Sequence, residues 1–175
     1  MAEKARGQLG LSPIARLDPW AYADSLGIFV RGADELDLPS IHVQQLLVND
    51  SDSWSGMTLK EDGIVIVVLN SSHARTRQSS TLMHEVSHVV LEHVPASVEV
   101  SSSGLLLLSE FSEDQEDEAN WLMGALLLPR PALLQEQNGE RSLTDIAMKF
   151  EISEDLVRWR LRMTGVDRQL RRRRA

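Results

Sequence analysis

Short runs of β-branched and apolar residues alternate along the chain with longer segments of helical period. Residues 28–30, 54–60 and 63–69 have the length and composition of strands. The last two flank a turn that contains an Asp-Gly pair, which predicts a hairpin between them. The run IVIVVL at residues 64–69 is apolar on both faces. We therefore expect this strand at the centre of the sheet, close beneath a helix.

Segments with recognisable helix signals make up most of the remaining chain. One helix is expected to start at Ser79 or Ser80, as its N-cap, and to run to about Glu92, with Pro95 ending it. Residues 94–108 are expected to be irregular or to form short strands. The other segments with a helical pattern are 19–26, 39–48 (helical or extended), 113–128, the residues after Pro131, and 142–165, where two helices flank a turn.

The composition limits the chemistry of any site. The sequence contains no cysteine among its 175 residues, which excludes disulfides, a thiol nucleophile and zinc sites built on thiolates. A transition metal would therefore need imidazole and carboxylate ligands. The first residues lack the apolar run of a signal peptide, and no apolar run reaches the roughly 18 residues that span a bilayer. We expect a cytoplasmic protein with no membrane partner.

The motif HEVSH at residues 84–88 is the strongest chemical signal in the sequence. On a helix, His84 and His88 lie on one face, one turn apart, and both imidazoles can bind one zinc ion. Glu85 then lies beside the open position of the metal, where it can take a proton from the attacking water and pass it to the departing amine. Apolar neighbours indicate a buried helix, which favours this interpretation over two histidines on a surface helix.

His93 follows the motif closely and is a candidate for a third zinc ligand. The extended metzincin motif, however, needs a glycine at position 91 and a histidine at position 94. This chain has Leu91 and Val94 at those positions, so the sequence does not fit that subclass.

A carboxylate on the next predicted helix is the better candidate, because catalytic zinc usually has three protein ligands. Glu116 is preferred, with Glu118 and Glu113 as alternatives. Asn120 lies one helical turn after Glu116, so both can face the metal. Asn120 could then accept a hydrogen bond from the free ring nitrogen of His84 and fix its tautomer.

The run RQSSTLMHEVSHVVLEH, followed about twenty residues later by EDEANWLMGALLLP, resembles the ImmA/IrrE family of metallopeptidases. That family shows R-Q-x-x-T-L-x-H-E-x-x-H and then E-x-x-A-N on a leucine-rich helix that ends in proline. The resemblance covers about residues 56–165. It implies a gluzincin-like fold and one zinc ion bound by His84, His88 and Glu116, with Glu85 as the base. It also implies a role in cleaving a repressor or antitoxin-like DNA-binding protein, in mobile elements or stress responses.

We therefore predict an α+β fold, with a small, twisted, mostly antiparallel sheet, zincin active-site helices packed on it, and a C-terminal helix-turn-helix-like segment. Residues 1–18 are expected to be a flexible N-terminus and 19–165 the metallopeptidase domain, with 142–165 packed on it and 166–175 as a basic tail. The predicted function is hydrolysis of a peptide bond in a protein substrate. The alternative is a DNA-binding or partner-binding regulator, in toxin-antitoxin or stress responses, whose zinc site is structural or sensory.

Charge is distributed unevenly along the chain. Residues 138–175 contain ten basic and six acidic residues, whereas the rest contains eight basic and twenty acidic ones. A basic end on an acidic body is compatible with contacts to nucleic acid, and the run Arg171–Arg174 could hold phosphates non-specifically. A solvated terminal helix explains the same composition, and we prefer that interpretation. The sequence does not indicate an oligomeric state.

The C-terminal segment also has helix-turn-helix spacing. The exposed face of its second helix is expected to carry Arg158, Arg160 and Arg162, and such a helix can lie in a major groove. We favour a structural role for this segment within the peptidase, with Trp159 and Leu161 in the core.

Overall fold

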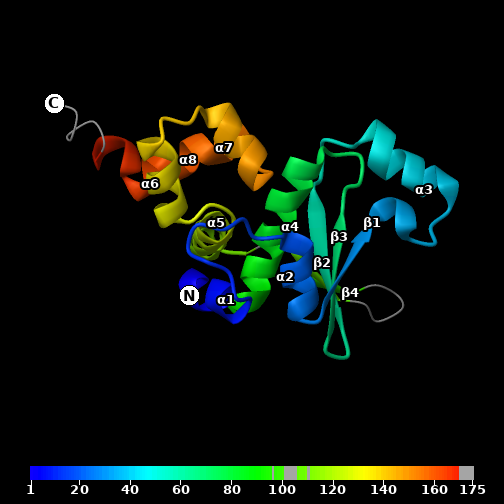
Figure 1. The fold of residues 1–175 in the computed structure, drawn as a ribbon. Helices are drawn as coiled ribbons and strands as arrows, with labels where there is room; N and C mark the ends of the chain where they lie inside the picture. The colour runs from blue at the N-terminus through cyan, green and yellow to red at the C-terminus, as the bar shows by residue number, and fades with distance from the viewer. Residues whose placement is uncertain (96, 101–105, 110, 170–175) are drawn as a thin grey trace. The chain divides into compact units, whose positions relative to one another are not determined.

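A computed structural model describes residues 1–95, 97–100, 106–109 and 111–169 of the chain. These residues form two compact units (Figure 1). One unit is Asp18–Asn120, and the other combines Met1–Leu17 with the chain from Trp121 onward. A domain can contain more than one such unit, and the predicted domain boundaries stay predictions.

The unit Asp18–Asn120 is built on a five-stranded sheet in the order β1-β3-β2-β5-β4. β1 runs parallel to β3, and the other neighbouring pairs are antiparallel, so the sheet is mostly antiparallel, as predicted. Two of its strands, β4 and β5, fall in the segment for which irregular structure or short strands are expected. The strands are β1 (Ile28–Gly32), β2 (Gly56–Glu61), β3 (Ile64–Leu69), β4 (Ser97–Val100) and β5 (Leu106–Ser109).

The structure confirms the predicted hairpin and the predicted central strand. β2 pairs with β3 through a turn in which Asp62 and Gly63 adopt left-handed conformations, with φ of 48° and 82°; an Asp-Gly pair permits this geometry. β3 lies between β1 and β2, and Val67, Val68 and Leu69 are at most 2% exposed. A strand covered on both faces needs apolar residues at consecutive positions, which explains the run IVIVVL.

Two helices pack on this sheet, α4 (Arg75–Val90) against β2 and β3, and α2 (Pro19–Ser25) against β1 and α4 (Figure 1). α4 fully buries Leu82, Met83 and Val86, and each such side chain contributes about 1.5–3 kcal/mol through its removal from water. The motif HEVSH therefore lies on a helix whose orientation is fixed by its own apolar face. The remaining short helices of this unit are η1 (Ala33–Glu35), α3 (Ser40–Gln44) and η2 (Gln45–Asn49).

The predicted start of α4 is wrong by one turn. The helix begins at Arg75, and Ser79 lies inside it, 3% exposed, rather than at its N-cap. Gln78 donates a hydrogen bond from Nε2 to the carbonyl of His73 at 2.7 Å. This bond holds the chain before the helix against its first turn, so the helix starts without a serine cap.

The second unit is helical in the residues that the structure describes. α8 packs against α6 and α7. The helices are α1 (Ala2–Gln8), the end of α5 (Glu113–Leu127), α6 (Arg130–Asn138), α7 (Leu143–Phe150) and α8 (Glu154–Thr164). Its core consists of side chains at most 2% exposed, among them Leu126, Leu127, Leu128, Leu133, Ile146, Phe150, Val157 and Val166.

The residues predicted as a flexible N-terminus, 1–18, contain a short helix and buried side chains. Residues 2–8 form α1, and Leu17 is only 1% exposed. Arg6 anchors this segment, because its Nη1 donates to the carbonyl of Leu126 at 2.6 Å and its Nη2 donates to the carbonyls of Ser12 and Ala15. A contact between residues 120 positions apart leaves no local sequence pattern.

The predicted helix-turn-helix pattern is confirmed in α7 and α8. Ser142 and Asp145 form a capping box at the start of α7, and the side chain of Ser153 accepts a hydrogen bond from the amide of Leu156 at the start of α8. Glu151 lies in the turn with a left-handed φ of 53°, where glycine is the usual residue.

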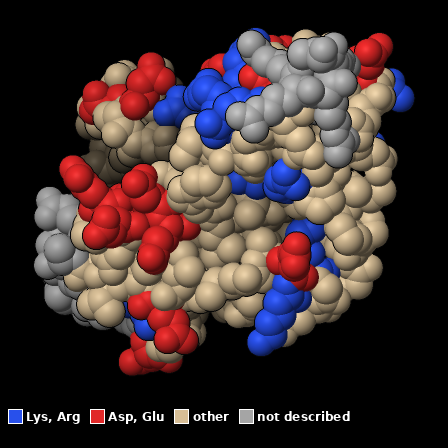
Figure 2. All heavy atoms as spheres, turned by 90° about the vertical axis from the view of Figure 1, so that its left-hand side faces the viewer, with Lys and Arg blue, Asp and Glu red and all other residues tan. Residues whose placement is uncertain are grey.

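Figure 2 shows both acidic and basic side chains on the face that it draws, in places side by side. The run Arg171–Arg174, for which phosphate contacts are considered above, lies outside the described residues.

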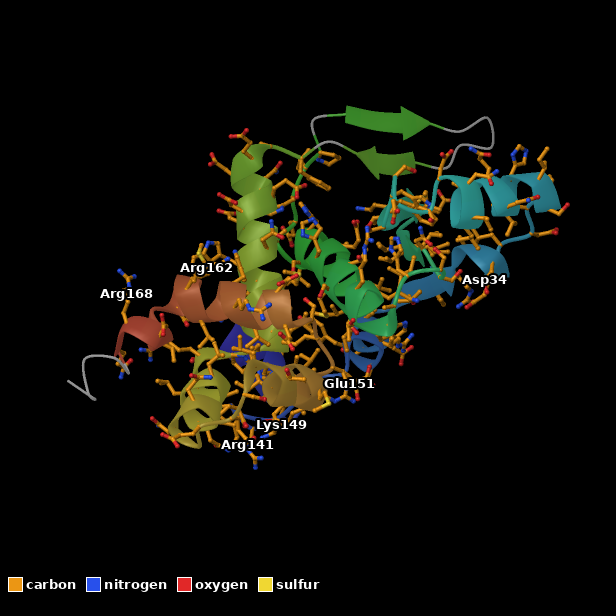
Figure 3. The ribbon with its side chains drawn as sticks, turned by 90° about the horizontal axis from the view of Figure 1, so that it is seen from above. Asp34, Arg141, Lys149, Glu151, Arg162 and Arg168 are labelled. Atoms are coloured by element: carbon orange, nitrogen blue, oxygen red, sulfur yellow. The ribbon has the colours of Figure 1, made fainter. Side chains whose placement is uncertain are left out.

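The predicted basic face of α8 is wrong. Residues two positions apart on a helix are separated by about 200°, so Arg160 cannot share a face with Arg158 and Arg162. Arg160 is 3% exposed, and its Nε donates to the carbonyl of Leu128 at 3.0 Å. Arg158 is exposed but forms ion pairs with two carboxylates of its own helix. Arg162 and Arg168 remain as exposed arginines that point outward in Figure 3, while Trp159 and Leu161, expected in the core, are only half-buried.

Candidate metal centre

Two histidines and a glutamate converge at one point in the unit Asp18–Asn120. His84 and His88 come from α4, and Glu116 comes from the first turn of α5. The Nε2 atoms of the histidines are 3.1 Å apart. Glu116 places Oε2 at 3.2 Å from Nε2 of His84 and Oε1 at 3.5 Å from Nε2 of His88. The structure thus brings the three predicted ligands together.

These separations fit a bound metal ion. Zinc lies roughly 2.0–2.2 Å from nitrogen and oxygen ligands, and a tetrahedral arrangement then separates the ligand atoms by about 3.3–3.6 Å. The observed 3.1, 3.2 and 3.5 Å are close to this range. Lone pairs held this close repel one another unless a metal ion or a shared proton lies between them. The group can therefore hold a metal ion.

Asn120 lies where the sequence predicts a hydrogen-bond partner of His84. Its Oδ1 is 3.1 Å from Nδ1 of His84. Because an amide oxygen only accepts hydrogen bonds, the imidazole proton belongs on Nδ1. The lone pair of Nε2 is then free to face Glu116 and the metal position, as ligation requires.

His93 and Glu118 are not ligands in this geometry but extend the hydrogen bonding of His88. Nδ1 of His88 lies 3.0 Å from Nδ1 of His93, and Nε2 of His93 lies 3.1 Å from Oε2 of Glu118. One protonation pattern satisfies both contacts: His88 donates from Nδ1 to His93, and His93 donates from Nε2 to Glu118. This pattern leaves the lone pair of Nε2 of His88 free for a metal.

The end of α4 explains how His93 reaches His88. Glu92 has a left-handed φ of 55° and donates from its amide to the carbonyl of Val89 at 3.1 Å. The amide of His93 donates to the carbonyl of His88 at 3.0 Å. These two bonds define a Schellman C-cap, which turns the chain back over the last helical turn. In the sequence His93 is a candidate only for a ligand, although its position just after the helix end is a local signal for this contact.

The imidazole of His88 is held in its neutral form. Its side chain is 4% exposed, and Phe111 stacks on the ring at 3.8 Å between centroids with 25° between the planes. Burial, followed by the nearby charges of His84 and His93, lowers the pKa of His88 to about 3. A metal ligand must be deprotonated, so His88 is ready to bind at neutral pH.

Glu85 is positioned by a threonine on the sheet. Oγ1 of Thr58 donates to Oε2 of Glu85 at 2.5 Å, and Thr58 is 2% exposed on β2. Burial raises the pKa of Glu85, and the nearby charge of Glu116 raises it further. The hydrogen bond from Thr58 and the charge of His84 lower this pKa, but burial is the largest effect. No local pattern marks Thr58, because the sheet brings it to α4 from 27 positions away.

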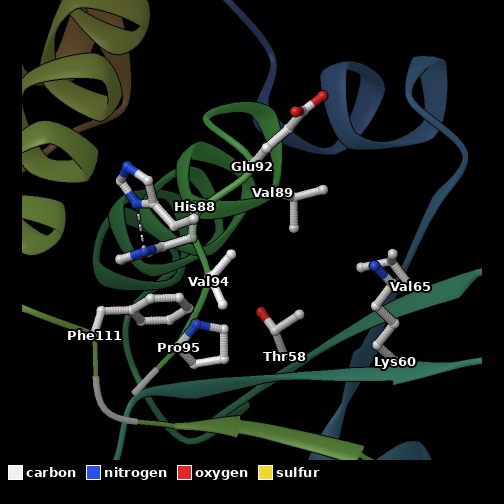
Figure 4. A pocket seen from close by; sticks show the side chains of 10 residues that line it. Thr58, Lys60, Val65, His88, Val89, Glu92, Val94, Pro95 and Phe111 are labelled. Atoms are coloured by element: carbon white, nitrogen blue, oxygen red, sulfur yellow. Dashed lines mark hydrogen bonds between the residues drawn. The ribbon is translucent and has the colours of Figure 1, made fainter. Parts of the chain in front are cut away.

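A cavity of about 500 Å³ adjoins His88 and Thr58 (Figure 4). Its walls are mostly apolar, and Figure 4 shows valine, proline and phenylalanine side chains around the space. Lys60 of β2 and Glu92 after α4 are charged residues at its boundary. The apolar residues that line it are Val65, Val89, Val94, Pro95 and Phe111.

Residues 39–162 match the family model described as the IrrE N-terminal-like domain, Peptidase_M78. The chain belongs to this family. It is also 30% identical over 132 residues to the phage-like element PBSX protein XkdA of Bacillus subtilis (strain 168). The aligned region is 70% of this chain and spans 63% of that relative's length. No solved structure gives a significant match.

Membership of Peptidase_M78 confirms the resemblance to ImmA/IrrE metallopeptidases. The family and the group of His84, His88 and Glu116 together support a metal-binding protein of the metallopeptidase type. Separately, none of the helices that the structure describes is long and apolar enough to cross a membrane.

The contact between His93 and His88 should contribute to the metal affinity of this Peptidase_M78 protein. Replacing His93 by alanine is expected to weaken metal binding by about 10- to 100-fold without abolishing it, because His88 loses the acceptor that orients its ring. Competition with a chelator of known affinity measures this change. Glu92→Gln is the matched control, since Glu92 precedes His93 and its side chain forms no hydrogen bond with a ligand among the described residues. Unchanged affinity in His93→Ala would show that the contact does not support the centre.

Proposed function

We propose that this protein is a zinc-dependent metallopeptidase that hydrolyses a peptide bond in a protein substrate. The observation that supports this most strongly is the convergence of two imidazole nitrogens and one carboxylate at 3.1–3.5 Å from one another, beside Glu85. Three nitrogen and oxygen ligands leave a position for water or substrate, as in catalytic rather than structural zinc sites. The chain has no thiolate to complete a closed site.

In this reaction Glu85 transfers the proton, and Thr58 holds Glu85 in place. When bound, zinc supplies a Lewis acid that makes hydroxide available from water at neutral pH. Glu85 takes a proton from the water while the water oxygen forms a bond to the carbonyl carbon of the substrate. Glu85 then delivers that proton to the amine nitrogen as the carbon–nitrogen bond breaks. Thr58 holds Oε2 of Glu85, so the other carboxylate oxygen is left for the proton.

The raised pKa of Glu85 suits this double role. An ordinary carboxylate is a weak base at neutral pH, whereas a carboxylate with a raised pKa accepts a proton more readily and still releases it. Burial is the first cause of the shift. The apolar surroundings that fix α4 against the sheet therefore also raise the pKa of Glu85, the proposed base.

The apolar cavity next to His88 and Thr58 supports a preference for substrates with an apolar side chain close to the scissile bond. A volume of about 500 Å³ is large enough for a leucine or phenylalanine side chain. An apolar residue that enters it gains roughly 1.5–3 kcal/mol from its removal from water. We propose that this contact contributes to the choice of the bond that is cleaved.

Filling the cavity should change the substrate preference but not the metal content. Val65→Trp is expected to lower kcat/KM at least about 10-fold for peptides with leucine or phenylalanine near the cleaved bond and to affect peptides with alanine there less. Cleavage profiles on a peptide mixture, with zinc analysis of each variant, measure this. Ile64→Trp is the control, because Ile64 is 50% exposed and successive strand residues face opposite sides. An equal loss for all peptides would refute the role of the cavity.

For the physiological substrate we propose a repressor or antitoxin-like DNA-binding regulator, cleaved in the cytoplasm. The resemblance to ImmA/IrrE peptidases supports this, as does a relative that belongs to a phage-like element. Incubation of the purified, zinc-loaded protein with the regulator encoded by the neighbouring gene tests the proposal. Cleavage at one site by the wild type and none by Glu85→Gln is the expected result; an intact regulator with both proteins would argue against this substrate.

A further inference from the structure

Two buried arginines donate hydrogen bonds to carbonyls at the C-terminal end of α5. Arg6 of α1 and Arg160 of α8 are 2% and 3% exposed. Arg6 donates to the carbonyl of Leu126 at 2.6 Å, and Arg160 donates to the carbonyl of Leu128 at 3.0 Å. The C-terminal end of a helix carries a partial negative charge of about half an elementary charge. That charge is too small to balance two guanidinium groups.

Neither guanidinium has an acidic partner in the part of the chain that the structure describes. The ion pairs found in the described part of the chain involve other basic residues. Nε of Arg6 and Nη1 of Arg160 are buried and have no hydrogen-bond partner among the described residues. Buried donors of this kind are rare and point to an ion or molecule that completes the site.

Guanidinium groups are not deprotonated at neutral pH in proteins. Burial lowers the pKa of Arg160 to about 10, and burial also lowers the pKa of Arg6. A pKa of about 10 still leaves Arg160 protonated at pH 7. The two guanidinium groups therefore place positive charge in a region removed from water. Burying that charge costs free energy, and a bound anion would offset this cost.

The same two side chains line a cavity of about 510 Å³. Arg130 lines it as well and donates from Nη2 to Oε1 of Gln169 at 2.6 Å. Glu3, also in the lining, is exposed and forms no ion pair with these arginines within the described residues. Most of the remaining wall is apolar, from Ala2, Leu11, Pro13, Ala125, Pro129 and Pro131.

We propose that this cavity binds a small organic anion, whose carboxylate or phosphate lies against Arg6 and Arg160 and whose apolar body lies against the proline-rich wall. Guanidinium groups match both oxyanions through paired N–H donors. The volume is in the range of sites for small organic ligands. The site lies in a different unit from the candidate metal centre, and its proposal does not depend on peptidase activity.

Binding is tested with the full-length, zinc-loaded protein in a buffer without other organic acids. Benzoate and phenyl phosphate present the two acidic groups on one apolar ring, and benzyl alcohol is their neutral counterpart. Calorimetry is expected to show saturable binding of at least one acid and at least about 10-fold weaker binding of the alcohol. At ten times its Kd the bound acid is expected to raise Tm by about 3–6 °C. The acid that binds more tightly identifies the acidic group that the site prefers.

Three variants locate the site. Arg160→Gln should weaken binding at least about 10-fold, but it also removes a structural hydrogen bond. Gly7→Phe avoids that problem, since Gly7 lines the cavity on α1, a Cβ atom added there meets no atom within 4 Å, and glycine is a poor helix residue. It should block binding in a folded protein. Arg162→Gln, on the same helix as Arg160 but exposed, should bind like the wild type. No binding of either acid, equal binding of benzyl alcohol, or unchanged binding by Gly7→Phe would overturn the proposal.

Discussion

Replacing Glu85 by glutamine is expected to reduce peptide-bond cleavage at least about 100-fold while the metal and the fold remain. Glutamine has the same shape and keeps an oxygen that can accept the hydrogen bond of Thr58, but it cannot accept a proton. Glu85 is also absent from the group of converging ligand atoms. The loss should therefore appear in kcat rather than in zinc content or Tm.

The measurement compares kcat, zinc content and Tm of the wild type and Glu85→Gln on one peptide substrate. Glu118→Gln is the matched control, because it changes another glutamate near the centre that is 66% exposed and pairs only with His93 among the described ion pairs. Full biological function of Glu85→Gln would contradict the peptidase account. It would instead favour the alternative, a regulator in which the zinc site is structural or sensory.

Removing either imidazole ligand is expected to abolish stoichiometric zinc binding. His84→Ala and His88→Ala each leave one nitrogen and one carboxylate, which are too few ligands to hold zinc with useful affinity. Glu116→Ala should also weaken binding strongly, because Glu116 contacts both imidazoles. Zinc content after dialysis, measured by elemental analysis, reports each loss.

The choice of carboxylate is tested by the pair Glu116→Ala and Glu118→Ala. Both residues lie in the first half of α5, yet Glu118 lies against His93 and reaches the centre only through it. Glu118→Ala should therefore have a much smaller effect than Glu116→Ala. If Glu118→Ala strips the metal and Glu116→Ala does not, Glu116 is not the third ligand.

Local patterns in the sequence account for much of the fold and of the candidate site. The i, i+4 spacing of His84 and His88 and that of Glu116 and Asn120 each place two side chains on one helix face, and the structure shows both pairs at the same point. The hairpin of β2 and β3 could be predicted because its signal, the Asp-Gly turn, lies within a few neighbouring residues.

Features that depend on distant contacts could not be predicted. Thr58 reaches Glu85 only because β2 packs beneath α4. The burial of Arg160 follows from its bond to Leu128, 32 positions away, and the order of the N-terminus follows from Arg6. His93 is an intermediate case, since its approach to His88 depends on a left-handed residue, Glu92, that is not the usual glycine.

The X-ray absorption spectrum of the purified protein at the zinc edge tests the metal centre most directly. The account predicts about one zinc per chain, with nitrogen and oxygen ligands at roughly 2.0–2.2 Å, scattering from imidazole rings and no sulfur. The double variant His84→Ala/His88→Ala should lose both the metal and this spectrum. Absence of stoichiometric zinc from the wild type, or full zinc occupancy in the double variant, would contradict the account.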